Sequence, residues 1–473
     1  MSAALTLVLI VAVAYLATHV AFDWIARRLL IVSGAEYLLL GLLLGPQVSG
    51  VLDEATLASF APFTTLALGW IGAIVGTQFY LPELVRINGI VYRLAFVEAI
   101  ITLSFVSGLM TVAMAWLFDM SYLSAAIPGL ALGAIAAIAA PTGIQVIASR
   151  IGRRTPVVHQ LEVTTAVDAA VAIAMIGLLM CFDHPSPSEL VRPLTTVEWF
   201  VVTLGIGLVG GVLFHLFLGS ERDSDRLFIS LAGAIILASG AAAYLELSPL
   251  LPATLVGAIL INTSGNREEI ERTLLSAERP FYFVLLIFAG ATWSPSLRAW
   301  ILPVLLFLAA RAAGKIGGAR LATRLNDQTD QLGLDWGRGL LGQGGLAIAI
   351  ALDYLQHERM PLTNIVFTAT VASVLLTDLS AAHLVRSVVM PFVTRRVGAE
   401  RARWILGADQ PPRTTRTSVE PPSGSSSFAS AEPTQTPSLT PPSPPSPPTG
   451  EPTPPPSRPP PPTSAPDAPR EES

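Results

Sequence analysis

The stretch "AIAAIAAPTGIQVIAS", residues 134–149, interrupts an otherwise apolar helical run with a proline and a glycine. Proline cannot donate the backbone hydrogen bond that continues a helix, so the step Pro141-Thr142-Gly143 predicts a break in the middle of an apolar segment. Backbone groups released at such a depth are tolerated only where they are buried in protein or line a cavity. The break therefore predicts a polar site inside an apolar fold.

A second interruption lies in "LLGQGGLAIAIAL", residues 340–352, where Gly342, Gln343, Gly344 and Gly345 follow one another. Each interrupted segment is next in sequence to a helix that carries buried charge. Interrupted segments at corresponding positions of two halves are typical of a transporter built on inverted repeats, with its site between them. We therefore predict two discontinuous core helices whose dipoles and free carbonyls surround an ion site.

The composition places most of the chain in a membrane. Of 473 residues, 52% are hydrophobic and only 13% are charged, and the mean hydropathy is +0.58. Soluble globular proteins are far less apolar, so that class is excluded. The C-terminal region differs, because it consists largely of Pro, Ser and Thr. We predict a transmembrane domain over residues 1–395 and a disordered tail over residues 396–473.

The apolar runs predict an all-α polytopic membrane protein with about thirteen transmembrane helices. Most arginines fall in alternate connections, whereas the other connections hold little beyond Arg192, Arg298 and Arg359. This asymmetry predicts an outside N-terminus and a cytoplasmic C-terminus, in the plasma or inner membrane. The expected spans are residues 4–24, 29–50, 56–79, 91–118, 122–148, 158–182, 197–219, 225–244, 248–263, 279–295, 299–320, 336–355 and 363–392.

Few ionisable residues fall deep inside these spans, where each costs several kcal/mol unless it faces water or a partner. Asp168 lies near the midplane, about 15 Å from the cytoplasmic end of its helix. Arg311 and Lys315 lie one turn apart on a later helix at a similar depth, so either can pair with this acid. Glu162 is nearer the cytoplasm, and its depth suits Lys315 better. The alternative to a functional role is a static salt bridge between helices.

Two hydroxyl groups lie close to Asp168 in the sequence, and other spans contain further acids. Thr164 and Thr165 precede Asp168 by one turn and offer oxygen ligands to a hard cation. The acids Glu98, Asp353 and Asp378 lie nearer helix ends, so interfacial positions are expected for them.

Lys315 is the only lysine among the 29 basic residues. Burial readily removes the proton of a lysine ammonium, whereas an arginine guanidinium stays charged. Our hypothesis is that this position needs a cation that loses its proton, or leaves its partner, when an ion arrives. The alternative is that a single lysine remains in an arginine-rich sequence and that its position is due to chance.

Seven segments, in order across about residues 5 to 395, resemble landmarks of the monovalent cation/proton antiporters, the sodium/hydrogen exchanger-type superfamily. They are "LLLGLLLGPQVSGVL", "AIAAIAAPTGIQVIAS", "TTAVDAAVAI", "SPLLPATLVGAIL", "FYFVLLIFAGATW", "LAARAAGKIGGARL" and "GQGGLAIAIAL".

This resemblance implies a homodimer whose core domain moves an ion-binding aspartate between the two faces of the membrane. Asp168 matches that aspartate, and the family's basic residue matches either Arg311 or Lys315. Relatives commonly carry Asp or Asn directly before the aspartate, where this chain has Val167. Stoichiometry and ion preference are therefore not carried over.

Together these features predict a secondary active transporter that exchanges Na⁺ or K⁺ for H⁺ by alternating access, since the sequence has no nucleotide-binding motif. Asp168 would bind either ion, with Thr142, Thr164, Thr165 and backbone carbonyls as further ligands. No enzymatic activity, cofactor or nucleic-acid partner is expected. One alternative is a channel-like K⁺ efflux pathway, and another is a membrane sensor or scaffold that acts through its tail. The tail itself is either a flexible spacer or a docking strip for a domain that binds proline-rich segments.

Overall fold

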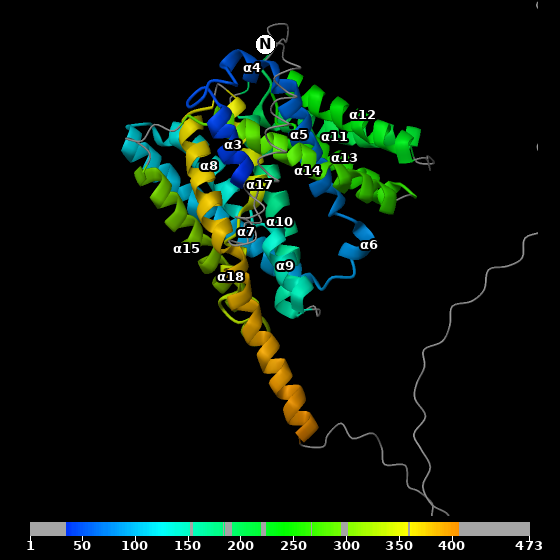
Figure 1. Cartoon of the computed structure of the whole chain (residues 1–473), viewed down its shortest axis with the longest axis vertical. Coiled ribbons are helices and arrows are strands. Elements are labelled where there is room, and N and C mark those ends of the chain that lie inside the picture. Colours follow the sequence, from blue (N-terminus) through cyan, green and yellow to red (C-terminus); the bar gives the residue numbers. More distant parts are fainter. Residues whose placement is uncertain are drawn as a thin grey trace, which may run out of the picture. The chain divides into compact units, whose positions relative to one another are not determined.

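A computed structural model describes residues 35–151, 155–182, 184, 192–218, 224–265, 267–294, 301–357 and 360–405, and all regular structure in these ranges is helical. The expected first span, residues 4–24, and nearly all of the expected tail lie outside them. The helices (Figure 1) are α3 Ala35–Leu44, α4 Glu54–Ser59, α5 Ala61–Thr77, α6 Leu81–Leu84, α7 Gly89–Phe118, α8 Tyr122–Ala137, α9 Pro141–Ile151, α10 Pro156–Met180, α11 Thr196–Leu218, α12 Ser224–Tyr244, α13 Leu250–Thr263, α14 Arg267–Thr292, α15 Ile301–Leu325, α16 Thr329–Leu332, η2 Trp336–Leu340, α17 Gly344–Gln356 and α18 Thr363–Ile405.

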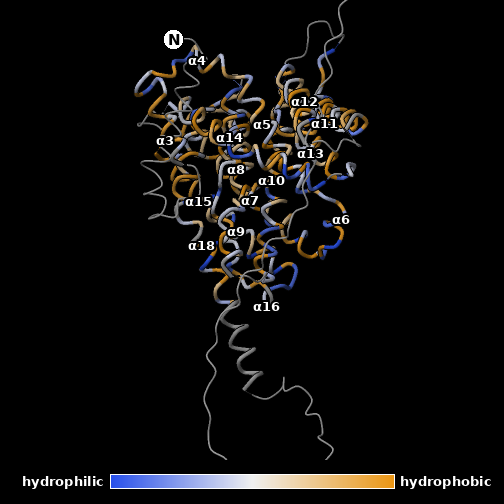
Figure 2. The backbone as a smooth tube through the Cα atoms, turned by 45° about the vertical axis from the view of Figure 1, so that its right-hand side comes forward, coloured by the Kyte–Doolittle hydropathy of each residue, from blue (hydrophilic) through white to orange (hydrophobic). Residues whose placement is uncertain are grey.

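The chain is a multi-pass membrane protein. Among the described residues, 7 helices are long and apolar enough to cross a membrane, or up to 8 if the bent pair within α18 is one span. Three shorter apolar helices, α5, α13 and α17, accompany them. Each expected span from 29–50 onward coincides with a helix or a pair of helices. Figure 2 shows hydrophobic residues along the helices, whereas stretches of hydrophilic residues lie near α6 and α16, among other places.

Two helix boundaries differ from expectation. α14 begins at Arg267, well before the expected start at residue 279, because its first turns are charged and no apolar window detects them. α18 runs on to Ile405, past the expected end of the membrane domain at residue 395. Helices therefore extend beyond the apolar runs at both places.

The helices pack in two groups. The crossing bundle consists of α7, α8, α9, α10, α15, η2, α17 and α18, and the flanking bundle consists of α3, α5, α11, α12, α13 and α14. Small residues set the closest approaches within the flanking bundle: side chains added at Gly41 and Gly290 would overlap the partner backbone between α3 and α14. Such small-residue contacts are a usual means of packing helices in membranes, where water does not drive association.

Both predicted breaks are present, and both fall slightly earlier than the residues that signalled them. α8 ends at Ala137, the next residues are extended, and Pro141 is the first residue of α9, where its missing N–H costs nothing. In the second half, η2 ends at Leu340 and α17 begins at Gly344.

The two unwound segments lie against each other inside the crossing bundle. The amide of Ala140 donates to the carbonyl of Gly342 at 2.8 Å. Gly344 has φ +65°, and a Cβ at this position would lie 3.0 Å from the Cβ of Ala140. Glycine is therefore needed here both for backbone conformation and for close approach.

Candidate ion-binding site

Lys315 pairs with two carboxylates in the middle of the crossing bundle. Its Nζ donates to Oδ2 of Asp168 at 2.7 Å and to Oε2 of Glu98 at 3.2 Å. All three side chains are 0% exposed. Asp168 lies twelve residues from either end of α10, Pro156–Met180, so the cluster sits at the centre of a membrane-spanning helix.

The remaining oxygens of the two acids differ. The hydroxyl of Thr102 donates to Oε1 of Glu98 at 2.7 Å, so both oxygens of this carboxylate are bonded. Oδ1 of Asp168 is buried and has no hydrogen-bond partner among the described residues. A buried carboxylate oxygen without a partner is costly unless it binds a proton or a cation.

Arg311 lies one turn before Lys315 on α15, but its guanidinium bonds to backbone carbonyls instead of carboxylates. It donates to Leu341 at 2.6 Å, to Ile138 at 2.9 Å and to Leu340 at 3.4 Å. Leu340 is the last residue of η2, and Ile138 and Leu341 directly follow α8 and η2, where a helix end leaves acceptors unpaired. Arg311 therefore neutralises the negative ends of both half-helices at once.

The start of α17 is held by polar groups from α18. The amides of Gln343 and Gly344 donate to Oδ1 of Asp378 at 2.9 and 3.2 Å. The Gln343 side chain donates to the carbonyl of Ile135 at 2.9 Å and accepts from the hydroxyl of Ser373 at 2.7 Å. A carboxylate at a helix N-terminus is favourable because the dipole is positive there.

The charges of the buried side chains around the two unwound segments do not balance. Lys315 and Arg311 supply two positive charges, whereas Glu98, Asp168 and Asp378 supply three negative charges when ionised. One proton or one monovalent cation would restore neutrality. The arrangement therefore lacks one positive charge, and Oδ1 of Asp168 is a buried oxygen there that has no hydrogen-bond partner among the described residues.

Two other predicted site residues, Thr164 and Thr165, lie one turn before Asp168 on α10. Thr164 and Thr165 are buried, and their hydroxyls donate at 2.8 Å to carbonyls of their own helix, those of Gln160 and Glu162. Their oxygens keep acceptor capacity for a cation. Thr142 is exposed in the first turn of α9, with Gly143 buried beside it.

Glu162 lies outside the cluster. Its side chain is half-buried, and in the part of the chain that the structure describes Lys315 forms its ion pairs with Glu98 and Asp168 instead. The expected match in depth between Glu162 and Lys315 therefore does not produce a contact.

The interfacial position expected for Glu98 is wrong, since this residue is 0% exposed and bonds to Lys315 in the central cluster. Asp353 is also buried, at 1% exposure, and lies near the end of α17 as expected. Distance from a helix end was a poor guide to Glu98, because α10 and α15 both pack on α7 at that level. Asp378 is half-buried on α18, and its carboxylate lies against the start of α17. The signal for Glu98 was a lone acid in a long apolar run with Thr102 one turn away.

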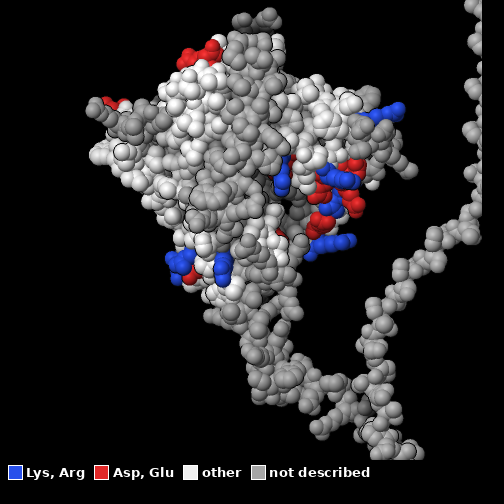
Figure 3. All heavy atoms as spheres, viewed as in Figure 1, with Lys and Arg blue, Asp and Glu red and all other residues white. Residues whose placement is uncertain are grey.

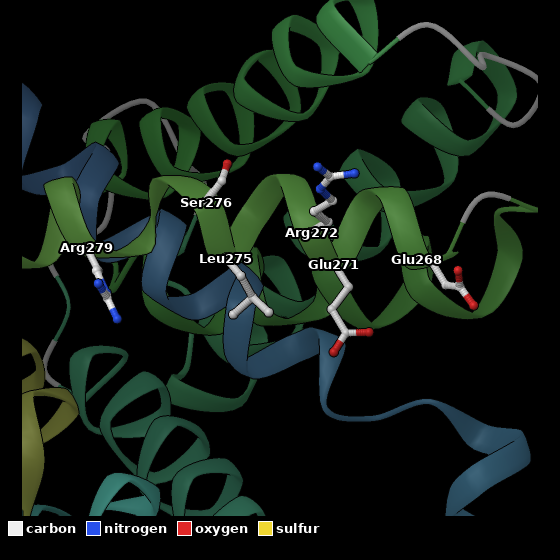
Figure 4. A pocket seen from close by; sticks show the side chains of 6 residues that line it. All are labelled: Glu268, Glu271, Arg272, Leu275, Ser276 and Arg279. Atoms are coloured by element: carbon white, nitrogen blue, oxygen red, sulfur yellow. The ribbon is translucent and has the colours of Figure 1, made fainter. Parts of the chain in front are cut away.

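A separate cavity of about 640 Å³ lies along the first half of α14. Figure 4 shows Glu268, Glu271 and Arg279 pointing to one side of this helix and Arg272 to the other. Acidic and basic side chains gather in this region, near α6 and α14, in Figure 3. Side chains of both signs of charge therefore line this cavity.

Comparison with known proteins identifies the fold. Two structures of the sodium/proton antiporter MjNhaP1 from Methanocaldococcus jannaschii are similar to the chain, with 17% and 18% identity and TM-scores of 0.59 and 0.56. Each match covers 82% of this chain and 99% or 98% of the other. No family model and no curated protein match the sequence. The chain thus has the fold of a cation/proton antiporter, as the sequence resemblance implied.

Proposed function

We propose that the protein is a secondary antiporter that exchanges a monovalent cation, Na⁺ or K⁺, for H⁺. The observation that carries the proposal is Oδ1 of Asp168, which is buried at the middle of α10 and has no hydrogen-bond partner in the described part of the chain. It lies beside an ammonium that is shared with Glu98. The antiporter fold supports the same conclusion, since MjNhaP1 is a sodium/proton antiporter.

Competition for one carboxylate couples the two fluxes. Asp168 binds a proton in one half of the cycle and a dehydrated cation in the other, so neither ion crosses without displacing the other. Thr142, Thr164, Thr165 and carbonyls of the interrupted helices supply the neutral oxygens that replace water around the cation. Alternating access then exposes Asp168 to each side in turn.

Glu98 determines what happens to Lys315 when a cation arrives. A cation on Asp168 repels the ammonium, which lies 2.7 Å from that carboxylate. Glu98 lies 3.2 Å from the same nitrogen and offers a second counter-charge. We infer that Lys315 stays charged by moving toward Glu98, so that one proton exchanges for one cation without net charge movement.

The proposed setting is the plasma or inner membrane, with the N-terminus outside and the tail in the cytoplasm, as the arginines indicate. A homodimer is part of the proposal. α11 carries exposed apolar side chains, among them Val201, Leu208 and Leu216, which suit contact with lipid or with a second copy.

The test is dissipation of a pH gradient in proteoliposomes that contain the full chain. Addition of Na⁺, K⁺ or Li⁺ is expected to move protons, whereas choline is not, and clamping the potential is expected to leave the rate unchanged. An absence of cation-dependent proton movement would overturn the proposal. Currents far above antiporter turnover would instead indicate a channel.

A further inference from the structure

Asp353 is a second buried carboxylate, on α17 and apart from the cluster of Lys315, Asp168 and Glu98. It is 1% exposed and lies in the last turn of α17, Gly344–Gln356. The hydroxyl of Ser248 donates to its Oδ2 at 2.6 Å. Its Oδ1 is buried without a hydrogen-bond partner among the described residues.

This carboxylate is in an electrostatically unfavourable place. The C-terminal end of a helix is negative, so an acid in the last turn is destabilising unless a cation compensates it. A neutral His357 does not compensate the charge of this acid. Its Nδ1 lies 2.7 Å from the backbone carbonyl of Asp353, which can only accept, so Nδ1 carries a hydrogen and donates it to that carbonyl. The same nitrogen is 3.9 Å from Oδ1.

Asp353 lines a cavity of about 900 Å³ between the crossing and flanking bundles. α17 contributes one wall, and α4, α5, α14 and the connection before α13 contribute the others. Oxygen-bearing side chains dominate its polar lining: Asp353, Gln356, Thr64, Thr65, Glu246 and Thr292. The titratable residues that line it are Asp353, Glu246 and His357, and none of the lining residues is a lysine or an arginine.

We propose that this cavity is a second cation site, in which Asp353 binds a monovalent alkali cation. Carboxylate, amide and hydroxyl oxygens are the ligands that hard cations prefer. A divalent ion fits less well, because the described residues contain no group of three or more His, Cys, Asp or Glu side chains that could hold a metal.

The site also bridges the two bundles. Ser248, in the connection between α12 and α13, bonds to Asp353, and the side-chain amide of Gln356 donates to Thr64 of α5 at 2.6 Å. A cation on Asp353 therefore sits where the bundles must separate if one moves against the other. The proposal goes beyond transport at Asp168 and requires only that a cation bind.

The experiment uses the purified full chain carrying Asp168→Asn, so that the first site lacks its proposed ion-binding carboxylate. Its melting temperature is measured in Na⁺, K⁺ or Li⁺ against choline at equal ionic strength. A saturating cation is expected to raise the melting temperature by about 2 to 6 °C. Adding Asp353→Asn removes the charge but keeps an acceptor for Ser248, and it is expected to abolish the shift.

Ser248→Ala is the matched control, because it removes the hydrogen bond and keeps the charge. In the Asp168→Asn background this variant is expected to retain most of the cation-dependent shift. Either of two results would overturn the proposal: no cation-dependent shift in Asp168→Asn, or an equal loss of the shift in Ser248→Ala and Asp353→Asn. Because no transport is measured, failure of antiport would leave this result intact.

Discussion

Lys315 and Arg311 lie one turn apart on α15 and are equally buried, at 0% and 1% exposure, yet they have different partners. The lysine bonds to two carboxylates, and the arginine bonds to three backbone carbonyls. A planar guanidinium with five donors can bond several fixed carbonyls at once, whereas an ammonium is a compact charge on a flexible stem. The difference teaches that Arg311 joins the ends of the two half-helices, whereas Lys315 joins the two carboxylates that we propose as the ion site.

The largest expected effect is that of Asp168→Asn, which tests the pairing of Lys315 with carboxylates. Asparagine has the same size and still accepts a hydrogen bond from Lys315, but it cannot ionise. Cation-driven proton movement in proteoliposomes is expected to fall below about a tenth of the wild-type rate. Retained exchange in correctly inserted protein would place the ion on another group.

Arg311→Gln tests the structural half of the contrast. Loss of the guanidinium leaves carbonyls of Ile138 and Leu341 unpaired, and each buried orphan costs about 1–3 kcal/mol. We expect the free energy of unfolding to fall by about 3 kcal/mol or more, seen as a lower melting temperature in detergent. Arg311→Lys keeps the charge but not the fork of donors, so it is expected to recover only part of this loss. A full recovery by lysine would mean that charge alone matters at this position.

Lys315→Arg sharpens the contrast, because it places an arginine's permanent charge at the lysine's position. If Lys315 stays charged through the cycle, exchange remains electroneutral in this variant and only its rate falls. Solid-supported-membrane currents are expected to be absent from both wild type and variant. Wild-type currents that disappear in Lys315→Arg would show instead that the lysine releases its proton.

Glu98→Gln is expected to give the smallest of these effects. The substitution removes the counter-charge to which Lys315 moves, so a cation on Asp168 meets a nearby ammonium that is less well compensated. We expect the KM for the cation to rise by about tenfold, with the maximal rate less affected. Thr102→Ala is the control, since it removes only the hydroxyl that bonds Glu98. An unchanged KM in Glu98→Gln would remove this acid from the mechanism.

Much of the fold was predictable from the sequence, because its determinants are local. Apolar runs long enough to span a membrane predict helices wherever the structure describes them, and the proline and glycine clusters predicted both interruptions. The expected depth of Asp168, Arg311 and Lys315 follows from a fixed rise of 1.5 Å per residue. These properties depend on a residue's place in its own helix and on nothing else.

The choice of partners was decided only by tertiary packing. Lys315 and Glu98 are 217 residues apart in the sequence, and Lys315 and Asp168 are 147 apart. Depth alone favoured Glu162 as the partner of Lys315. It also left open whether Lys315 or Arg311 pairs with Asp168. Side chains at the same depth meet only if their helices face each other, and this depends on how α7, α10 and α15 pack. The periodicity of a single helix carries no information about which neighbour its buried face will meet.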